Sequence, residues 1–114
     1  MKRKEIFGFV RSVICAMYDA GYPAAVQEST TTSTMYIECP FVSSKIRVSD
    51  HSFGKEWYRY NFTPRSNGGV SMKDGRIFYP MNDFGIEAFV SDLMNDCPLE
   101  RFHKKPKSKK EAPC

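Results

Sequence analysis

The chain has 114 residues, which is enough for one domain with a single hydrophobic core but not for two. Its formal net charge of +4 lies entirely in residues 99–114, because the eleven basic and eleven acidic side chains before this segment cancel. This balance excludes a uniformly basic nucleic-acid-binding domain, and the absence of any run of about eighteen apolar residues excludes a membrane-spanning helix.

The first element expected in chain order is an amphipathic helix over residues 3–20. Its apolar side chains recur at spacings of three and four residues: Ile6, Phe9, Val10, Val13, Ile14 and Met17. Gly21 suits a left-handed cap and Pro23 cannot continue a helix, so we expect the helix to end there. Arg11 interrupts the apolar stretch and Asp19 follows it, which argues against a signal peptide and predicts a cytoplasmic protein.

Four strands are expected next, and each of them alternates between two sets of side chains. They cover Thr34–Cys39, Lys45–Asp50, Trp57–Phe62 and Gly75–Tyr79. Val70–Met72 is a candidate fifth strand, which would pair with the fourth across the Asp74-Gly75 turn. Short connections rich in turn residues favour an antiparallel meander with one buried and one exposed face.

A second helix is expected over Asp83–Asp96, capped by Asn82 or Asp83 and ended by Cys97-Pro98. The expected fold class is therefore α+β, with an antiparallel sheet of four to five strands and both helices packed on one face. Residues 1–98 would form the single domain. Residues 99–114 are rich in Lys and Pro, and we expect them to form a disordered basic tail.

The sheet face away from the helices is the predicted binding surface. Its candidate residues are Lys45, Arg47, Trp57 and Arg59, with His51 as a polar contact. The tail adds five candidate lysines: Lys104, Lys105, Lys107, Lys109 and Lys110. Cations interleaved with an aromatic ring are typical of sheets that bind single-stranded nucleic acid. The same pattern also occurs on ordinary solvated sheet faces, and Glu38 and Glu56 dilute the positive potential.

Catalytic and metal-binding patterns are not apparent. Ser49, Asp50 and His51 are the residue types of a hydrolase triad, but neighbours on a strand point to opposite faces, so Asp50 would not orient His51. The four cysteines contain no Cys-x-x-Cys pair: Cys15, Cys39, Cys97 and Cys114. A zinc site is therefore not expected. We expect a protein that is not an enzyme and that needs no cofactor or metal.

Two segments resemble small uncharacterised proteins of bacteriophages and other mobile elements. They are Thr34-Met35-Tyr36-Ile37 and Lys45-Ile46-Arg47-Val48-Ser49-Asp50-His51, so the resemblance covers about residues 33–51. It implies a non-enzymatic phage accessory protein. Our leading hypothesis is a module that binds a protein partner, including a host defence complex or other host machinery. The alternative hypothesis is a single-stranded nucleic-acid-binding module that uses the strand face and the tail.

Overall fold

The computed structural model describes residues 2–28, 34–50, 57–66 and 69–99. Within these residues, two helices, six strands and one 3-10 helix follow in this order: α1 (Arg3–Asp19), β1 (Ala25–Glu28), β2 (Met35–Glu38), β3 (Ile46–Val48), β4 (Tyr60–Phe62), η1 (Pro64–Ser66), β5 (Ser71–Lys73), β6 (Arg76–Tyr79) and α2 (Asp83–Asp96). The predicted α+β class is confirmed. Neither described helix is long and apolar enough to cross a membrane.

Both helices begin and end close to where the sequence predicts. Helix α1 buries one stripe of side chains, Ile6, Val10, Val13 and Met17. Gly21 follows its end with a positive φ of 97°, a conformation that glycine adopts without strain. Helix α2 is capped by Asn82, whose side chain accepts a 2.8 Å hydrogen bond from the Gly85 amide. These local signals are sufficient to fix both helices because they act within one or two turns.

The sheet is mixed and has six strands in the order β1-β2-β3-β4-β6-β5, so the prediction of an antiparallel meander with four to five strands is wrong. Strand β4 runs parallel to both β3 and β6, whereas the other three pairings are antiparallel. Alternation of side chains identifies a strand but not its direction. Residues 49–59 separate β3 from β4, and parallel neighbours need a connection of about this length, whereas a hairpin needs only a few residues. Strand β1 was not expected, because its four residues, Ala25–Glu28, are mostly exposed.

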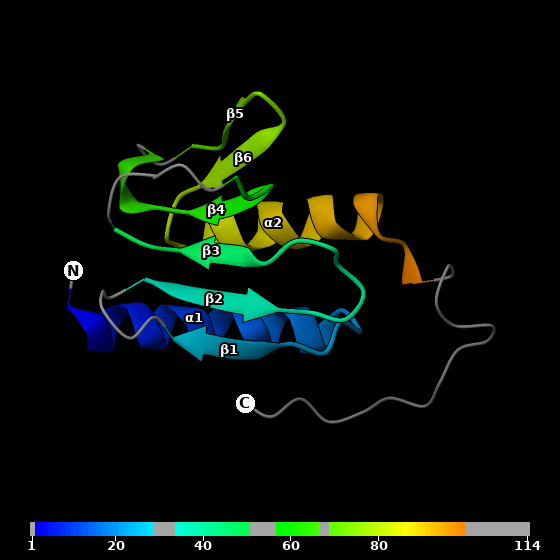
Figure 1. The fold of residues 1–114 in the computed structure, drawn as a ribbon, viewed down its shortest axis with the longest axis horizontal. Helices are drawn as coiled ribbons and strands as arrows, with labels where there is room; N and C mark the ends of the chain where they lie inside the picture. The colour runs from blue at the N-terminus through cyan, green and yellow to red at the C-terminus, as the bar shows by residue number, and fades with distance from the viewer. Residues whose placement is uncertain (1, 29–33, 51–56, 67–68, 100–114) are drawn as a thin grey trace.

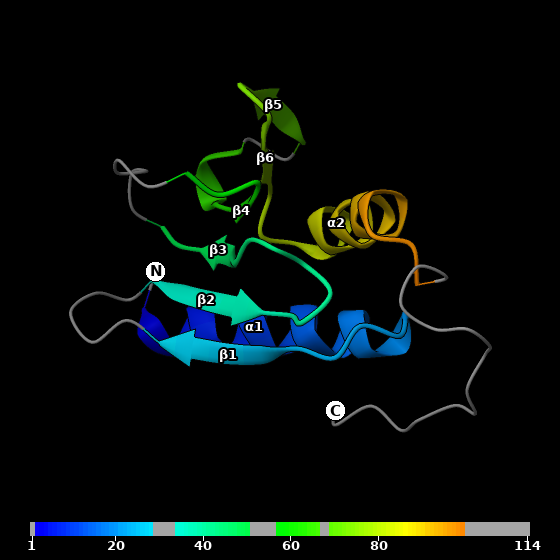
Figure 2. The ribbon, with the colours of Figure 1, turned by 45° about the vertical axis from the view of Figure 1, so that its right-hand side comes forward.

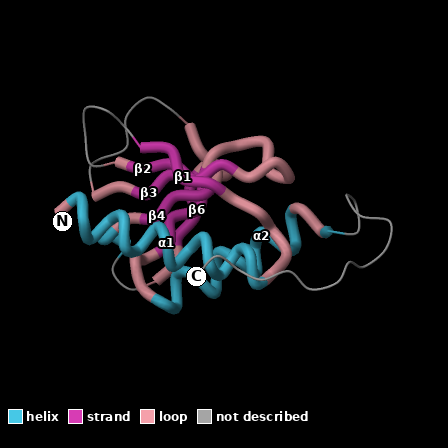
Figure 3. The backbone as a smooth tube through the Cα atoms, turned by 90° about the horizontal axis from the view of Figure 1, so that it is seen from below, coloured by secondary structure: helices cyan, strands magenta, loops and turns pink. Residues whose placement is uncertain are grey.

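Both helices lie on one side of the sheet, as the sequence predicts (Figure 1; Figure 3). The inward side chains of the four inner strands meet the two helices in one core: Met35, Ile37, Ile46, Val48, Tyr60, Phe62, Ile77 and Tyr79. Phe89 of α2 makes edge-on ring contacts with Tyr60 and Phe62, each at 5.3 Å, and with Tyr79 at 5.6 Å. This aromatic cluster joins α2 to strands β4 and β6.

The sheet twists strongly, so the β5–β6 hairpin runs across the direction of β1 and β2 (Figure 2). The hairpin closes through Asp74 and Gly75, whose φ angles are 53° and 81°. Two successive positive φ angles are what a tight two-residue hairpin turn requires. The Asp-Gly turn is therefore confirmed, with the fifth strand shifted by one residue to Ser71–Lys73.

Candidate binding site

The middle of the predicted binding face is closed. Arg47 is 8% exposed and Asn61 is 1% exposed, although both alternate away from the helices. The Asn61 side-chain amide donates hydrogen bonds of 2.8 Å to the Tyr58 carbonyl and 3.3 Å to the Ile77 carbonyl. The Tyr58 ring also packs against Tyr36 on this face, with 5.5 Å between ring centroids. The Tyr58 ring therefore covers part of the surface that the alternation predicts to be open.

Trp57 and Arg59 do not lie on a strand, because β4 begins only at Tyr60 and the predicted strand started too early. The Arg59 Nε atom donates to Asp96 Oδ2 at 2.9 Å, and its Nη1 atom donates to the Gly75 carbonyl at 2.9 Å. These contacts turn Arg59 toward the last turn of α2 and away from the strand face. Trp57 is 53% exposed beside the β5–β6 turn.

The remaining sequence candidates have different outcomes. His51 lies outside the described residues, as do the tail lysines of residues 104–110. Lys45, like Trp57, is accessible in the structure, with 41% of its side chain exposed. Its ammonium group donates to Gln27 Oε1 at 2.7 Å and lies 3.6 Å from Glu38 Oε2. It also lies 5.7 Å from the centre of the Tyr36 ring.

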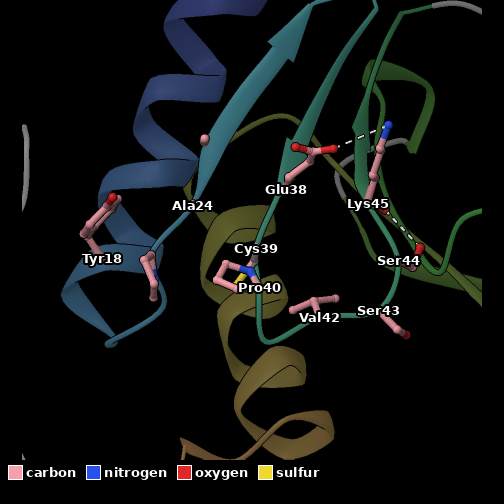
Figure 4. A pocket seen from close by; sticks show the side chains of 11 residues that line it. Tyr18, Ala24, Glu38, Cys39, Pro40, Val42, Ser43, Ser44 and Lys45 are labelled. Atoms are coloured by element: carbon pink, nitrogen blue, oxygen red, sulfur yellow. Dashed lines mark hydrogen bonds and ion pairs between the residues drawn. The ribbon is translucent and has the colours of Figure 1, made fainter. Parts of the chain in front are cut away.

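Lys45 forms part of the rim of an open pocket of about 600 Å³. Figure 4 shows that its walls come from separate parts of the chain, with Tyr18 on α1, Ala24 before β1, and Glu38 and Val42 on either side of Cys39 and Pro40. Apolar carbon from Pro and Ala residues and from Val42 lines much of the pocket. The Glu38–Lys45 pair and the Ser43 and Ser44 hydroxyls add polar groups. We call this site the β1–β3 pocket.

The loop that forms one wall of the β1–β3 pocket is held in place by contacts on both sides. The Val42 amide donates a 3.0 Å hydrogen bond to the Cys39 carbonyl, which closes a turn. The Phe41 ring packs edge-on against Tyr22, with 6.2 Å between centroids. Tyr22 in turn donates a 2.5 Å hydrogen bond to the Cys97 carbonyl at the end of α2. A wall anchored in this way is largely formed before any ligand binds, which reduces the ordering cost of binding.

Three observations describe the chemistry of the β1–β3 pocket and its surroundings. Its lining holds one thiol, Cys39, and burial raises the pKa of that thiol, so it stays protonated and weakly nucleophilic near neutral pH. The positive charge of Lys45 is balanced by the Glu38 carboxylate, 3.6 Å away. Among the described residues, no three His, Cys, Asp or Glu side chains are grouped closely enough to hold a metal ion.

The sequence predicts Lys45 as a binding residue but does not predict the β1–β3 pocket around it. Pro23 and Pro40 mark the two bends that form its walls, and both could be recognised as breaks. The walls meet only because β1 pairs with β2, and β1 has no apolar alternation to reveal it. Comparisons of the chain with protein-family models, curated proteins and solved structures found no match.

Proposed function

We propose that this protein is a small non-enzymatic binding module that recognises a partner protein through the β1–β3 pocket. The observation that carries the proposal is the composition of this site. It combines an apolar lining with the ion pair between Glu38 and Lys45. Its wall loop is held by the packing of Phe41 against Tyr22 before any ligand binds. Protein interfaces combine an apolar centre with a polar rim in the same way. A short loop or peptide segment of a partner fits a shallow pocket of this kind.

Charge and burial argue for a protein ligand over a nucleic acid. A single strand of nucleic acid needs a positive groove and accessible rings on which its bases stack. Here Lys45 is paired with Glu38, Arg47 is buried, and Arg59 is paired with Asp96. Among the predicted face residues that the structure describes, Trp57 alone remains as an exposed ring, and it lies outside the pocket.

The class of partner follows from the resemblance of residues 33–51 to bacteriophage proteins. Small phage accessory proteins of this type suggest a component of host machinery, including a defence complex, as the partner. The resembling segment borders the β1–β3 pocket through Glu38 at the end of β2 and Lys45 directly before β3. The segment that carries the resemblance therefore also supplies part of the proposed site.

Affinity capture from a lysate of the source cells tests the proposal when two matched variants are compared. Lys45→Glu reverses the charge at the pocket rim and places it beside Glu38. Lys73→Glu makes the same change on the exposed edge strand β5. We expect the wild type and Lys73→Glu to capture the same protein after nuclease treatment. Lys45→Glu should lose most of it, because like charges then face each other at the rim.

Two results would contradict the proposal. Loss of all captured material after nuclease treatment would favour the nucleic-acid hypothesis. Equal capture by Lys45→Glu and Lys73→Glu would show that a partner binds elsewhere on the molecule. Circular dichroism and the unfolding midpoint of each variant would verify that the fold is intact, since both substituted side chains are at least partly exposed.

A further inference from the structure

An open groove of about 570 Å³ lies between α1 and α2. Small and apolar side chains form much of its lining, with Ala16 from α1, Ala20 directly after α1, and Val90 and Met94 from α2. Met94 is 51% exposed although it is apolar. The groove belongs to the helical layer and shares no lining residue with the β1–β3 pocket.

The charges around this groove have one sign. Asp19 and Glu87 line it, and no Lys or Arg is among its lining residues. Helix α2 as a whole carries four acidic residues and no basic residue: Asp83, Glu87, Asp92 and Asp96. Two of these carboxylates are engaged within the fold, because Asp92 accepts from Tyr79 and Asp96 accepts from Arg59 and Tyr60. The groove itself therefore presents apolar surface beside negative charge.

The C-terminal ends of both helices lie together at one end of the groove. Tyr22, just after α1, donates a 2.5 Å hydrogen bond to the carbonyl of Cys97, the residue that caps α2. The last turn of a helix carries partial negative charge, which a cation stabilises. Neither α1 nor α2 has a basic residue in its last turn. The end of α1 therefore adds to the negative potential at this point, whereas the last turn of α2 has the Arg59 guanidinium beside it through Asp96.

We propose that the Lys-rich segment 100–114 docks as an extended chain in the groove between α1 and α2 of its own molecule. The described chain reaches Leu99, whose side chain lies against Gly21 at the end of α1. Segment 100–114 thus begins where the two helix ends meet. It carries five lysines and one aromatic side chain, Phe102, which suit an acidic groove with an apolar floor.

The length of the segment is also sufficient. Helix α2 has 14 residues and is therefore about 21 Å long. Residues 100–114 can span roughly 50 Å when extended, so the segment can follow the whole groove without strain. Docking as an extended chain needs no folded structure in the segment, which agrees with its low apolar content. This inference is independent of the proposed partner site, because the two surfaces share no lining residue.

Limited trypsin digestion of the full chain tests the docking. The double variant Asp19→Asn/Glu87→Gln removes both groove carboxylates. The matched double variant Glu28→Gln/Asp74→Asn removes two exposed carboxylates outside the groove lining and leaves the same net charge. Asn suits the positive φ of residue 74. Mass spectrometry would give the cleavage rate at residues 104–110.

Docking predicts that the groove variant is cleaved about fivefold faster than the wild type at low salt, as expected from losing two surface ion pairs. The matched variant should be cleaved at the wild-type rate, and about 0.5 M salt should remove the difference by screening. Equal cleavage rates of the two double variants at low salt would overturn the proposal. A protection that depends on protein concentration would also overturn it, because the segment would then bind a second copy.

A second measurement does not rely on the protease. Full-length chain with all five tail lysines replaced by Gln is compared with the wild type by amide NMR. Docking predicts shift changes concentrated at Ala16, Ala20, Val90 and Met94, which line the groove. Changes absent from these residues, or centred on the β1–β3 pocket, would contradict docking in the groove.

Discussion

Tyr60 in β4 donates a 2.5 Å hydrogen bond to the Oδ2 atom of Asp96, which lies in the last turn of α2. Arg59, its neighbour in the sequence, donates to the same oxygen at 2.9 Å and also bonds the Gly75 carbonyl. One carboxylate thus connects the helix to the parallel strand β4 and, through Arg59, to the β5–β6 turn. This connection explains why Arg59 is unavailable on the outer face of the sheet.

The Asp96 carboxylate should make the stability of the fold depend on pH. Burial by itself would raise its pKa, but the hydrogen bonds from Arg59 and Tyr60 outweigh burial and lower the pKa below its ordinary value. A lowered folded-state pKa stabilises the fold above the unfolded carboxyl pKa of about 3.9, and this contribution is lost as the pH falls through the folded-state value. We expect urea unfolding between about pH 6 and pH 2 to show a smaller loss of stability for Asp96→Asn than for the wild type. If the unfolding free energies of the wild type and Asp96→Asn fell in parallel with pH, Asp96 would contribute nothing to acid unfolding.

The sequence is sufficient to predict those elements that local interactions determine. Both helices, the Asn82 cap and the Asp74-Gly75 turn are confirmed, since each depends on residues within a few positions of one another. Strand direction is different, because it depends on the path of the connection between strands. The parallel pairing of β3 with β4 could not be inferred from alternation, which is the same in either direction.

Gly85 and Gly8 should respond in opposite ways to replacement by alanine. A Cβ atom on Gly85 would lie 1.9 Å from the Pro80 carbonyl oxygen, whereas a Cβ on Gly8 would have no neighbour within 4 Å. Gly85→Ala should therefore lower the free energy of unfolding by about 1–3 kcal/mol or more through overpacking. Gly8→Ala should raise it by about 0.5–1 kcal/mol, because alanine is the better helix former. Urea denaturation of both variants measures the difference, and equal effects would refute the close approach of α2 to Pro80.

Phe89 should be the most important single side chain of α2 for stability. It is fully buried and contacts the rings of Tyr60, Phe62 and Tyr79. Phe89→Ala should lower the free energy of unfolding by about 3–5 kcal/mol. Phe84 on the same helix is 55% exposed, so Phe84→Ala should change the free energy of unfolding by less than about 0.5 kcal/mol. Similar costs for the two variants in chemical denaturation would mean that the buried face of α2 is assigned incorrectly.

Alternation also does not show which residues of the candidate site are accessible, just as it does not show the direction of the strands. Lys45 was predicted as a binding residue, and the structure places it at the rim of a pocket. Arg47 and Arg59 were predicted from the same alternation but are buried or paired with Asp96. The Arg59 contacts join it to Asp96 and Gly75, which are far away in the sequence, and alternation carries no information about such contacts.

Binding of a fluorescent single-stranded oligonucleotide should depend on the tail and not on the folded domain. Full-length chain with five tail Lys→Gln replacements should bind weakly at physiological salt, because Lys45 and Arg59 are already paired with carboxylates. Trp57→Ala should not weaken the residual binding further. Sub-micromolar binding by the tail variant that falls about tenfold or more with Trp57→Ala, as expected for a ring stacked on a base, would support the nucleic-acid hypothesis instead.

Hydrogen exchange of the chain with and without its captured partner tests the proposed binding site most directly. We expect the partner to slow exchange at amides of residues 24–25 and 38–45, which line the β1–β3 pocket and its loop. Residues 71–73 of the edge strand β5 should exchange at the same rate in both samples. Protection confined to β5 or to the groove between the helices, with unchanged exchange at residues 38–45, would contradict the β1–β3 pocket as the site of partner binding.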